Sequence, residues 1–134
     1  MGTTRLPELS RFELQCLGIL WSLGDASIRD VHGAIESAPS YSTVKKIFER
    51  LEEKGAVRRV GREGKSTVFR SAVKPRSMIR KEIRRLLDAV FAGEASSLVA
   101  HLADMRELTL EDLREIERSL VETESGADKP RGRR

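Results

Sequence analysis

Residues 41–55 carry the sequence YSTVKKIFERLEEKG, and this stretch decides the fold. Its apolar residues stand at positions 44, 47, 48 and 51, the spacing that places side chains on one face of an α-helix. The closing Lys54 and Gly55 are typical of the cationic last turn and glycine cap that end a helix. The sequence therefore predicts a helix over residues 42–54 with one apolar face and one charged face.

Two further helices are predicted before this one. Ser10 and Ser27 are each followed, at the third position, by an acidic residue, which is the capping-box pattern of a helix start. Apolar residues then recur at helical spacing over residues 11–23 and 28–37. About four residues separate the second predicted helix from the third, which is the connection length of a helix-turn-helix.

The spacing of the apolar residues changes after Gly55. Residues 56–60 and 67–70 are predicted to form two strands joined by a Gly-rich turn at residues 61–65. Three helices followed by a basic hairpin are the element order of a winged helix-turn-helix. The predicted fold class is therefore mainly α, a winged helix-turn-helix of three helices plus a two-stranded β wing, at residues 1–74.

The remaining chain is predicted to be an α-helical dimerisation arm, residues 75–123, followed by a disordered basic tail, residues 124–134. The arm has three helices, the first opened by Pro75 and the last by Thr109. About 50 residues rarely close a stable core alone, so we expect a symmetric homodimer. The predicted interface residues are Ile83, Leu87, Val90, Leu98, Leu102, Leu113, Ile116 and Leu120.

Basic charge is concentrated in the middle of the chain. Residues 41–85 hold 15 of the 25 Lys and Arg residues but only 5 of the 21 Asp and Glu residues, although the net charge is +4. This pattern favours a surface that binds a polyanion. The predicted contacts with double-stranded operator DNA are Ser42, Thr43, Lys45, Lys46 and Arg50 on the third helix, and Arg62 and Lys65 in the wing. A solvated helix face is the alternative interpretation, and Arg50 is alternatively structural.

Other functional classes find little support in the sequence. The two histidines, His32 and His101, are far apart, and no nucleophile with a base or glycine-rich phosphate loop is present, so we expect neither an enzyme nor a metal or cofactor site. The single cysteine, Cys16, stands in an apolar helical stretch and is expected to be buried. No apolar run is long enough to span a bilayer or to direct secretion, so we expect a cytoplasmic protein that binds no membrane directly.

Several stretches resemble the penicillinase-repressor family of winged-helix transcriptional regulators. The similarity begins in residues 9–21 and in the Ser-Ile-Arg-Asp-Val of residues 27–31. It continues through the Tyr-Ser-Thr-Val-Lys-Lys-Ile of residues 41–47, Arg50-Leu51, Lys54-Gly55, the Arg/Gly wing and the apolar residues from Leu86 to Phe91. The resemblance extends from about Leu6 to Glu122.

The resemblance implies a homodimer with interlocking C-terminal helices that represses resistance or stress genes. It also implies a membrane sensor-protease pathway in those members that are cut at an Asn-Phe pair in the arm. His101-Leu102 stands at the matching position here, so that cleavage pair is absent. The clustered C-terminal cysteines of the copper-responsive branch are also absent.

Two other functions are consistent with the pattern. A winged-helix protein-interaction module would use the basic region to bind an acidic partner, and a preference for palindromic DNA would exclude it. A ligand-binding regulator would need a pocket in the arm, on which the sequence says little.

Overall fold

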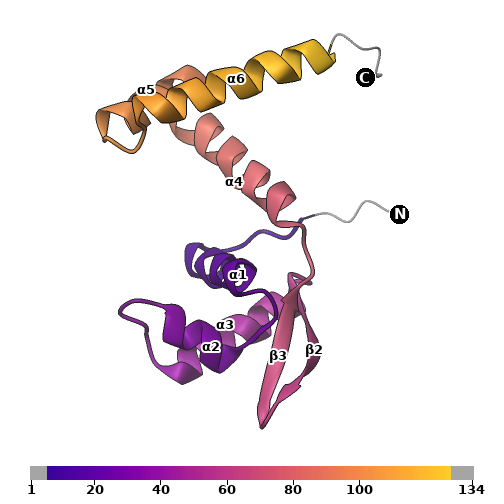
Figure 1. The fold of residues 1–134 in the computed structure, drawn as a ribbon. Helices are drawn as coiled ribbons and strands as arrows, with labels where there is room; N and C mark the ends of the chain where they lie inside the picture. The colour runs from indigo at the N-terminus through magenta and orange to yellow at the C-terminus, as the bar shows by residue number, and fades with distance from the viewer. Residues whose placement is uncertain (1–5, 128–134) are drawn as a thin grey trace. The chain divides into compact units, whose positions relative to one another are not determined.

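The computed structural model describes residues 6–127 of the 134-residue chain. It is mainly helical with a small antiparallel sheet, which confirms the predicted fold class (Figure 1). In chain order the elements are α1 Arg11–Leu23, β1 Ala26–Ser27, α2 Ile28–Ala34, α3 Tyr41–Glu53, β2 Val57–Glu63, β3 Ser66–Ser71, α4 Pro75–Val90, α5 Ala95–Asp104 and α6 Leu110–Ala127.

The predicted capping boxes form at the starts of α1 and α2. The Ser10 hydroxyl accepts from the Glu13 N–H at 3.1 Å, and the Ser27 hydroxyl accepts from the Asp30 N–H at 3.1 Å. The predicted end of the second helix at residue 37 is wrong, because α2 stops at Ala34. Ile35 turns to an extended conformation there and its side chain is buried.

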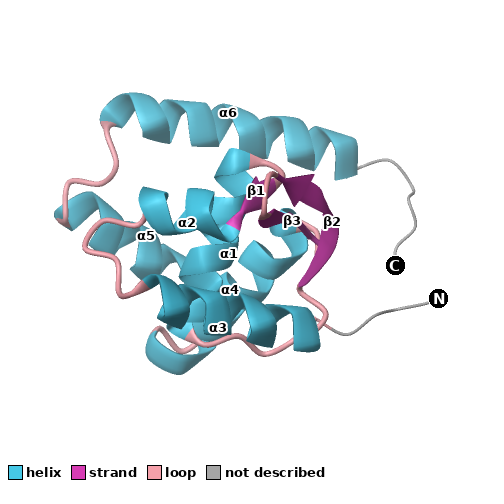
Figure 2. Ribbon diagram, turned by 90° about the horizontal axis from the view of Figure 1, so that it is seen from below, coloured by secondary structure: helices cyan, strands magenta, loops and turns pink. Residues whose placement is uncertain are grey.

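The sheet has the strand order β1-β3-β2 (Figure 2). The predicted turn at residues 61–65 is too long, since β2 continues through a β-bulge at Val60 and only two residues join the strands. Gly64 has a φ of +64° and opens this turn, a conformation that side chains with a Cβ disfavour. The strand β1 was not predicted, because two residues are too few to show an alternating pattern.

The core of the winged-helix unit lies between α1, α3 and the sheet. Leu17, Val44 and Phe48 are fully buried, and the Phe48 ring lies 5.2 Å from that of Phe69 in β3. Met78 of α4 is also fully buried in this core. The chain divides into two compact units, Met1–Glu82 and Ile83–Arg134.

The second unit contains the end of α4 together with α5 and α6. A capping box between Thr109 and Asp112 starts α6, as predicted. The helix reaches Ala127, so residues 124–127, predicted to begin a disordered tail, are helical. No proline interrupts the sequence of α6 before residue 130, and the rest of the predicted tail, residues 128–134, lies outside the described residues.

Within the described residues, no single helix is long and apolar enough to cross a membrane. The helices α4 and α5 reach the required length and hydropathy only as a pair, and a bend of 92° separates them.

Candidate nucleic-acid interface

The core fixes which face of α3 meets solvent. Val44, Ile47 and Leu51 are buried on one side, so Lys45 and Lys46 lie on the exposed side. Neither lysine makes a salt bridge or side-chain hydrogen bond with any residue that the structure describes. Two cations on a rigid helix are therefore available to an external anion.

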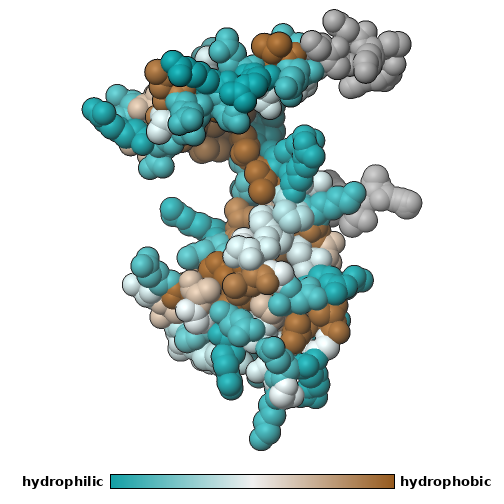
Figure 3. Space-filling view, in the orientation of Figure 1, coloured by the Kyte–Doolittle hydropathy of each residue, from teal (hydrophilic) through white to brown (hydrophobic). Residues whose placement is uncertain are grey.

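All the side chains predicted to contact DNA are exposed. The structure brings Ser42, Thr43, Lys45, Lys46 and Arg50 together on α3, and it places Arg62 and Lys65 at the end of the hairpin. Figure 3 shows hydrophilic side chains projecting where Figure 1 places that end of the hairpin.

Ser40 caps the N-terminus of α3, so the helix begins one residue earlier than predicted. Its hydroxyl accepts from the Thr43 N–H at 3.2 Å and lies 2.9 Å from the Thr43 hydroxyl and 3.1 Å from that of Ser42. Three hydroxyls thus gather at the end of a helix that favours anions. Ser40 is a common type of capping residue, but its role was not predicted from the sequence.

Positive charges near the end of α3 act on the buried carboxyl of Glu13. Burial alone would raise the pKa of the Glu13 carboxyl. The hydrogen bonds from Lys54 and the Ser10 N–H outweigh this, with Coulomb attraction from Lys54 and, least, from Arg50, so the pKa lies below its usual value. Arg50 contributes the least of these effects, and its side chain is exposed on α3.

Two other arginines of the hairpin hold it in place. The Arg70 guanidinium donates to both carboxylate oxygens of Asp25 at 3.0 and 2.8 Å, and this pairing holds the pKa of Asp25 below its usual value. The Arg59 guanidinium donates to both oxygens of Glu52, at 2.9 and 3.2 Å, and lies over the Phe69 ring. Neither anchor was predicted from the sequence, because Asp25 and Arg70 are 45 positions apart, and Glu52 and Arg59, although only 7 apart, lie in different elements.

The wing tip has a simpler geometry. Arg62 donates to the Lys65 carbonyl at 3.4 Å across the two-residue turn. The charged ends of both side chains are exposed beside Gly64. A tight basic tip of this kind suits contact with a phosphate backbone.

The residues predicted to form the dimer interface differ in their exposure to solvent. Ile83, Val90, Leu113, Ile116 and Leu120 are exposed, while Leu98 and Leu102 are half-buried. Leu87 is only 6% exposed, so it is already covered within one chain. Every α6 side chain from residue 110 to 124 is exposed, including its apolar residues.

The histidine and cysteine residues that were considered for catalysis or metal binding have structural roles instead. The His32 Nε2 lies 2.9 Å from the Pro39 carbonyl oxygen, and the ring meets Tyr41 edge-on. Cys16 is fully buried, as expected, and burial raises its pKa to about 11. Among the described residues, no group of three or more His, Cys, Asp or Glu side chains is placed to hold a metal ion.

Comparison with known families gives a match to the penicillinase repressor model over residues 9–122. The chain belongs to the penicillinase repressor family. The penicillinase repressors are DNA-binding transcriptional regulators, and the exposed α3 and hairpin described above lie inside the matched residues. Comparison with curated proteins gave no match.

Two solved structures have a similar fold. A mutant of MarR from E. coli matches with a TM-score of 0.50 and 12% identity, over 87% of this chain and 78% of that chain. FabT from Streptococcus pneumoniae, solved in complex with DNA, matches with a TM-score of 0.50 and 17% identity, over 93% of this chain and 80% of that chain. At these identities the likeness establishes the winged-helix fold alone.

Proposed function

We propose that this penicillinase-repressor family member binds a palindromic operator as a cytoplasmic homodimer and thereby represses resistance or stress genes. In this proposal α3 lies in the major groove and the hairpin follows the phosphate backbone beside it. The observation that carries it is the exposed pair Lys45 and Lys46, which have no ion-pair partner among the described residues.

The arrangement of α3 supports a division of roles. Ser42 and Thr43 lie in the first turn, where hydroxyls and free backbone N–H groups bind phosphate. Lys45 and Lys46 follow within the first two turns, at the depth from which recognition helices contact base edges. Arg62 and Lys65 extend the cationic surface to the backbone. The DNA complex of the similarly folded FabT supports this use of the fold.

The exposed apolar residues of the second unit support the homodimer. Leu110, Ile116 and Leu120 of α6 are 65%, 43% and 58% exposed, which is costly for large aliphatic side chains in water. A two-fold copy would cover them and would present two recognition helices to a two-fold symmetric site. A sensor-protease is not part of the proposal, because residues 101–102 are His-Leu.

Alanine substitutions on α3 test the proposal directly. Lys45→Ala and Lys46→Ala should each weaken binding to a site selected from random duplex DNA by about tenfold, because each removes a groove contact. Lys74→Ala, which removes a lysine outside the proposed interface, should leave affinity within about twofold. The melting temperature should stay unchanged in all three. A loss of affinity matched by a loss of thermal stability would instead mean that the lysines are structural.

A further inference from the structure

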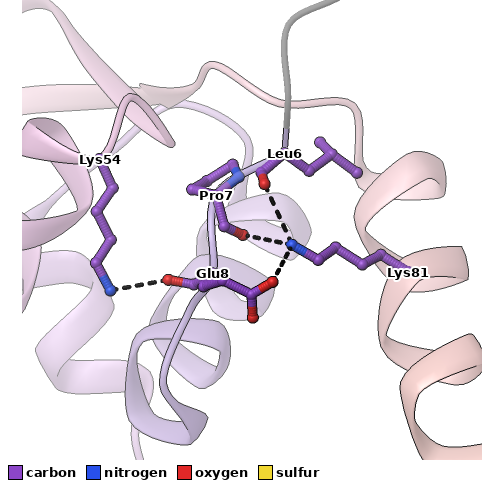
Figure 4. A pocket seen from close by; sticks show the side chains of 5 residues that line it. All are labelled: Leu6, Pro7, Glu8, Lys54 and Lys81. Carbon is purple, nitrogen blue, oxygen red and sulfur yellow. Dashed lines mark hydrogen bonds and ion pairs between the residues drawn. The ribbon is translucent and has the colours of Figure 1, made fainter.

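Two lysines converge on the segment that precedes α1. The Lys81 ammonium of α4 donates to the carbonyl oxygens of Leu6 and Pro7, at 3.2 and 3.1 Å, and pairs with a Glu8 carboxylate oxygen at 3.0 Å (Figure 4). The Lys54 ammonium, at the C-terminus of α3, donates to the Glu8 carbonyl at 2.9 Å. Residues 6–9, called the strap below, therefore link the end of α3 to α4.

The strap is also fixed at its other end. The Leu9 side chain is buried in the core of the winged-helix unit. Lys54 donates at 2.6 Å to Glu13, a carboxylate only 2% exposed, in addition to its bond to the strap. Charge-assisted hydrogen bonds are stronger than neutral ones, and Glu13 is buried, whereas the Glu8 side chain is 74% exposed.

Both ammonium groups of this site already have oxygen partners within the chain. Lys54 and Lys81 already point at carbonyl and carboxylate oxygens, as Figure 4 shows. The Lys81 side chain is only 21% exposed. Its ammonium group therefore contacts oxygen atoms of the strap more than it contacts water. The hydrogen bonds and ion pairs of Lys54 and Lys81 can fix the first turns of α4 against the end of α3.

We propose that the strap, Lys54 and Lys81 form a clamp that fixes the direction of α4 relative to the recognition helix α3. α4 runs without a break from Pro75 to Val90, and in the proposed homodimer we take its direction to govern the separation of the two recognition helices. The clamp thereby sets the half-site spacing that the dimer accepts, an inference that rests on the proposed function. Lys81 is a positioning residue in this scheme and touches no DNA.

Operator spacing provides the first test. Affinity is measured for the selected operator and for versions with one or two base pairs added to or removed from its centre. The wild-type protein should lose about tenfold or more with each altered spacing. Lys81→Met, which keeps most of the aliphatic stem, should lose about five- to tenfold on the original operator and little on the altered ones. Lys74→Met is the matched control and should behave as wild type.

A distance measurement tests the clamp without DNA. Spin labels at Glu49→Cys in α3 and Arg80→Cys in α4 report the distance between the two helices, with labelled chains diluted into unlabelled protein. The buried Cys16 stays unlabelled. Lys81→Met should broaden the distance distribution, and Lys74→Met should leave it narrow.

The two tests separate the clamp from the proposed function. An unchanged distance distribution in Lys81→Met would overturn the clamp, and so would an equal loss of affinity at every spacing. If the wild-type protein selects no DNA site, the proposed function fails, and the distance distribution alone decides whether the clamp positions α4.

Discussion

Glu13 is a buried carboxylate with two kinds of partner, and only one of them was predictable. The Ser10 N–H donates to it at 2.9 Å within a capping box, a local pattern that the sequence contains. The Lys54 ammonium comes from 41 positions away, and its approach depends on how α1 packs against α3. Pairs of this kind, which include Asp25 with Arg70, follow only from the tertiary structure.

Glu13→Gln should lower the free energy of unfolding by about 1–3 kcal/mol at pH 7, because the amide keeps the size but loses the charge that Lys54 pairs with. The pKa of Glu13 is lowered in the folded state, so its charge stabilises the fold at pH values above the unfolded pKa. This contribution disappears as the pH falls through the folded pKa. Urea unfolding of both proteins at about pH 7 and about pH 3.5 should therefore give a smaller difference at the lower pH.

Glu36→Gln is the control for that experiment, since Glu36 is an exposed carboxylate. It should change the free energy of unfolding by less than about 0.5 kcal/mol at either pH. A difference between wild type and Glu13→Gln that grows on acidification would contradict the assignment of a lowered pKa.

Two glycines with different backbone conformations should show opposite changes in stability when each is replaced by alanine. Gly55, which follows α3, has a φ of +79°, whereas Gly18 lies inside α1, and a Cβ at either position meets no atom within 4 Å. Gly55→Ala should cost about 1 kcal/mol of stability through backbone strain, and Gly18→Ala should add about 0.5–1 kcal/mol through helix propensity. Thermal unfolding of both variants checks the two signs, and a stabilised Gly55→Ala would refute the left-handed conformation.

The helices were more predictable than the strands. Capping residues and a 3.6-residue period located α1, α4 and α6 closely, because both signals are local. The hairpin was predicted as an element, but its turn was not. Gly61 resembles a turn residue and instead sits in a bulged strand, while Gly64 alone needs the positive φ. Bulges depend on pairing between strands, which a single strand's sequence does not encode.

The hairpin and α3 should contribute to binding in different ways. Arg62→Ala combined with Lys65→Ala should weaken binding to all DNA sequences by a similar factor, and it should reduce the salt dependence by about one to two phosphate contacts. Lys45→Ala or Lys46→Ala should weaken the selected operator more than scrambled DNA. Titrations of each variant at several salt concentrations separate the two effects, and loss of sequence preference in the hairpin variant would reverse the assigned roles.

The exposed apolar side chains of α6 are the reason that we expect a dimer. Leu113→Asp combined with Ile116→Asp should give monomers, because a two-fold interface would bury the new carboxylates without partners. Ser119→Asp adds a charge elsewhere on the same exposed helix and should leave a dimer. Sedimentation velocity distinguishes these states. A double variant that still sediments as a dimer would remove α6 from the interface.

At the scale of the whole molecule, the sequence predicted the winged-helix order, the basic region and a separate helical arm. The contact-based division of the chain falls after Glu82, and Met78, which lies beyond the predicted boundary at residue 74, is buried in the N-terminal core. The exposure of the predicted DNA contacts agrees with the sequence pattern, since the apolar face of α3 determines its opposite face. The structural anchors Arg59 and Arg70 could not be separated from DNA-contacting arginines by charge alone.

Selection of bound sequences from a random duplex library, at about 150 mM salt where nonspecific phosphate binding is weakened, is the most direct test of the proposed function. We expect one enriched motif with two-fold symmetry, bound by two chains in a shift assay against scrambled DNA. Failure of the folded protein to enrich any sequence would contradict it and would favour a winged-helix protein-interaction module that binds an acidic partner.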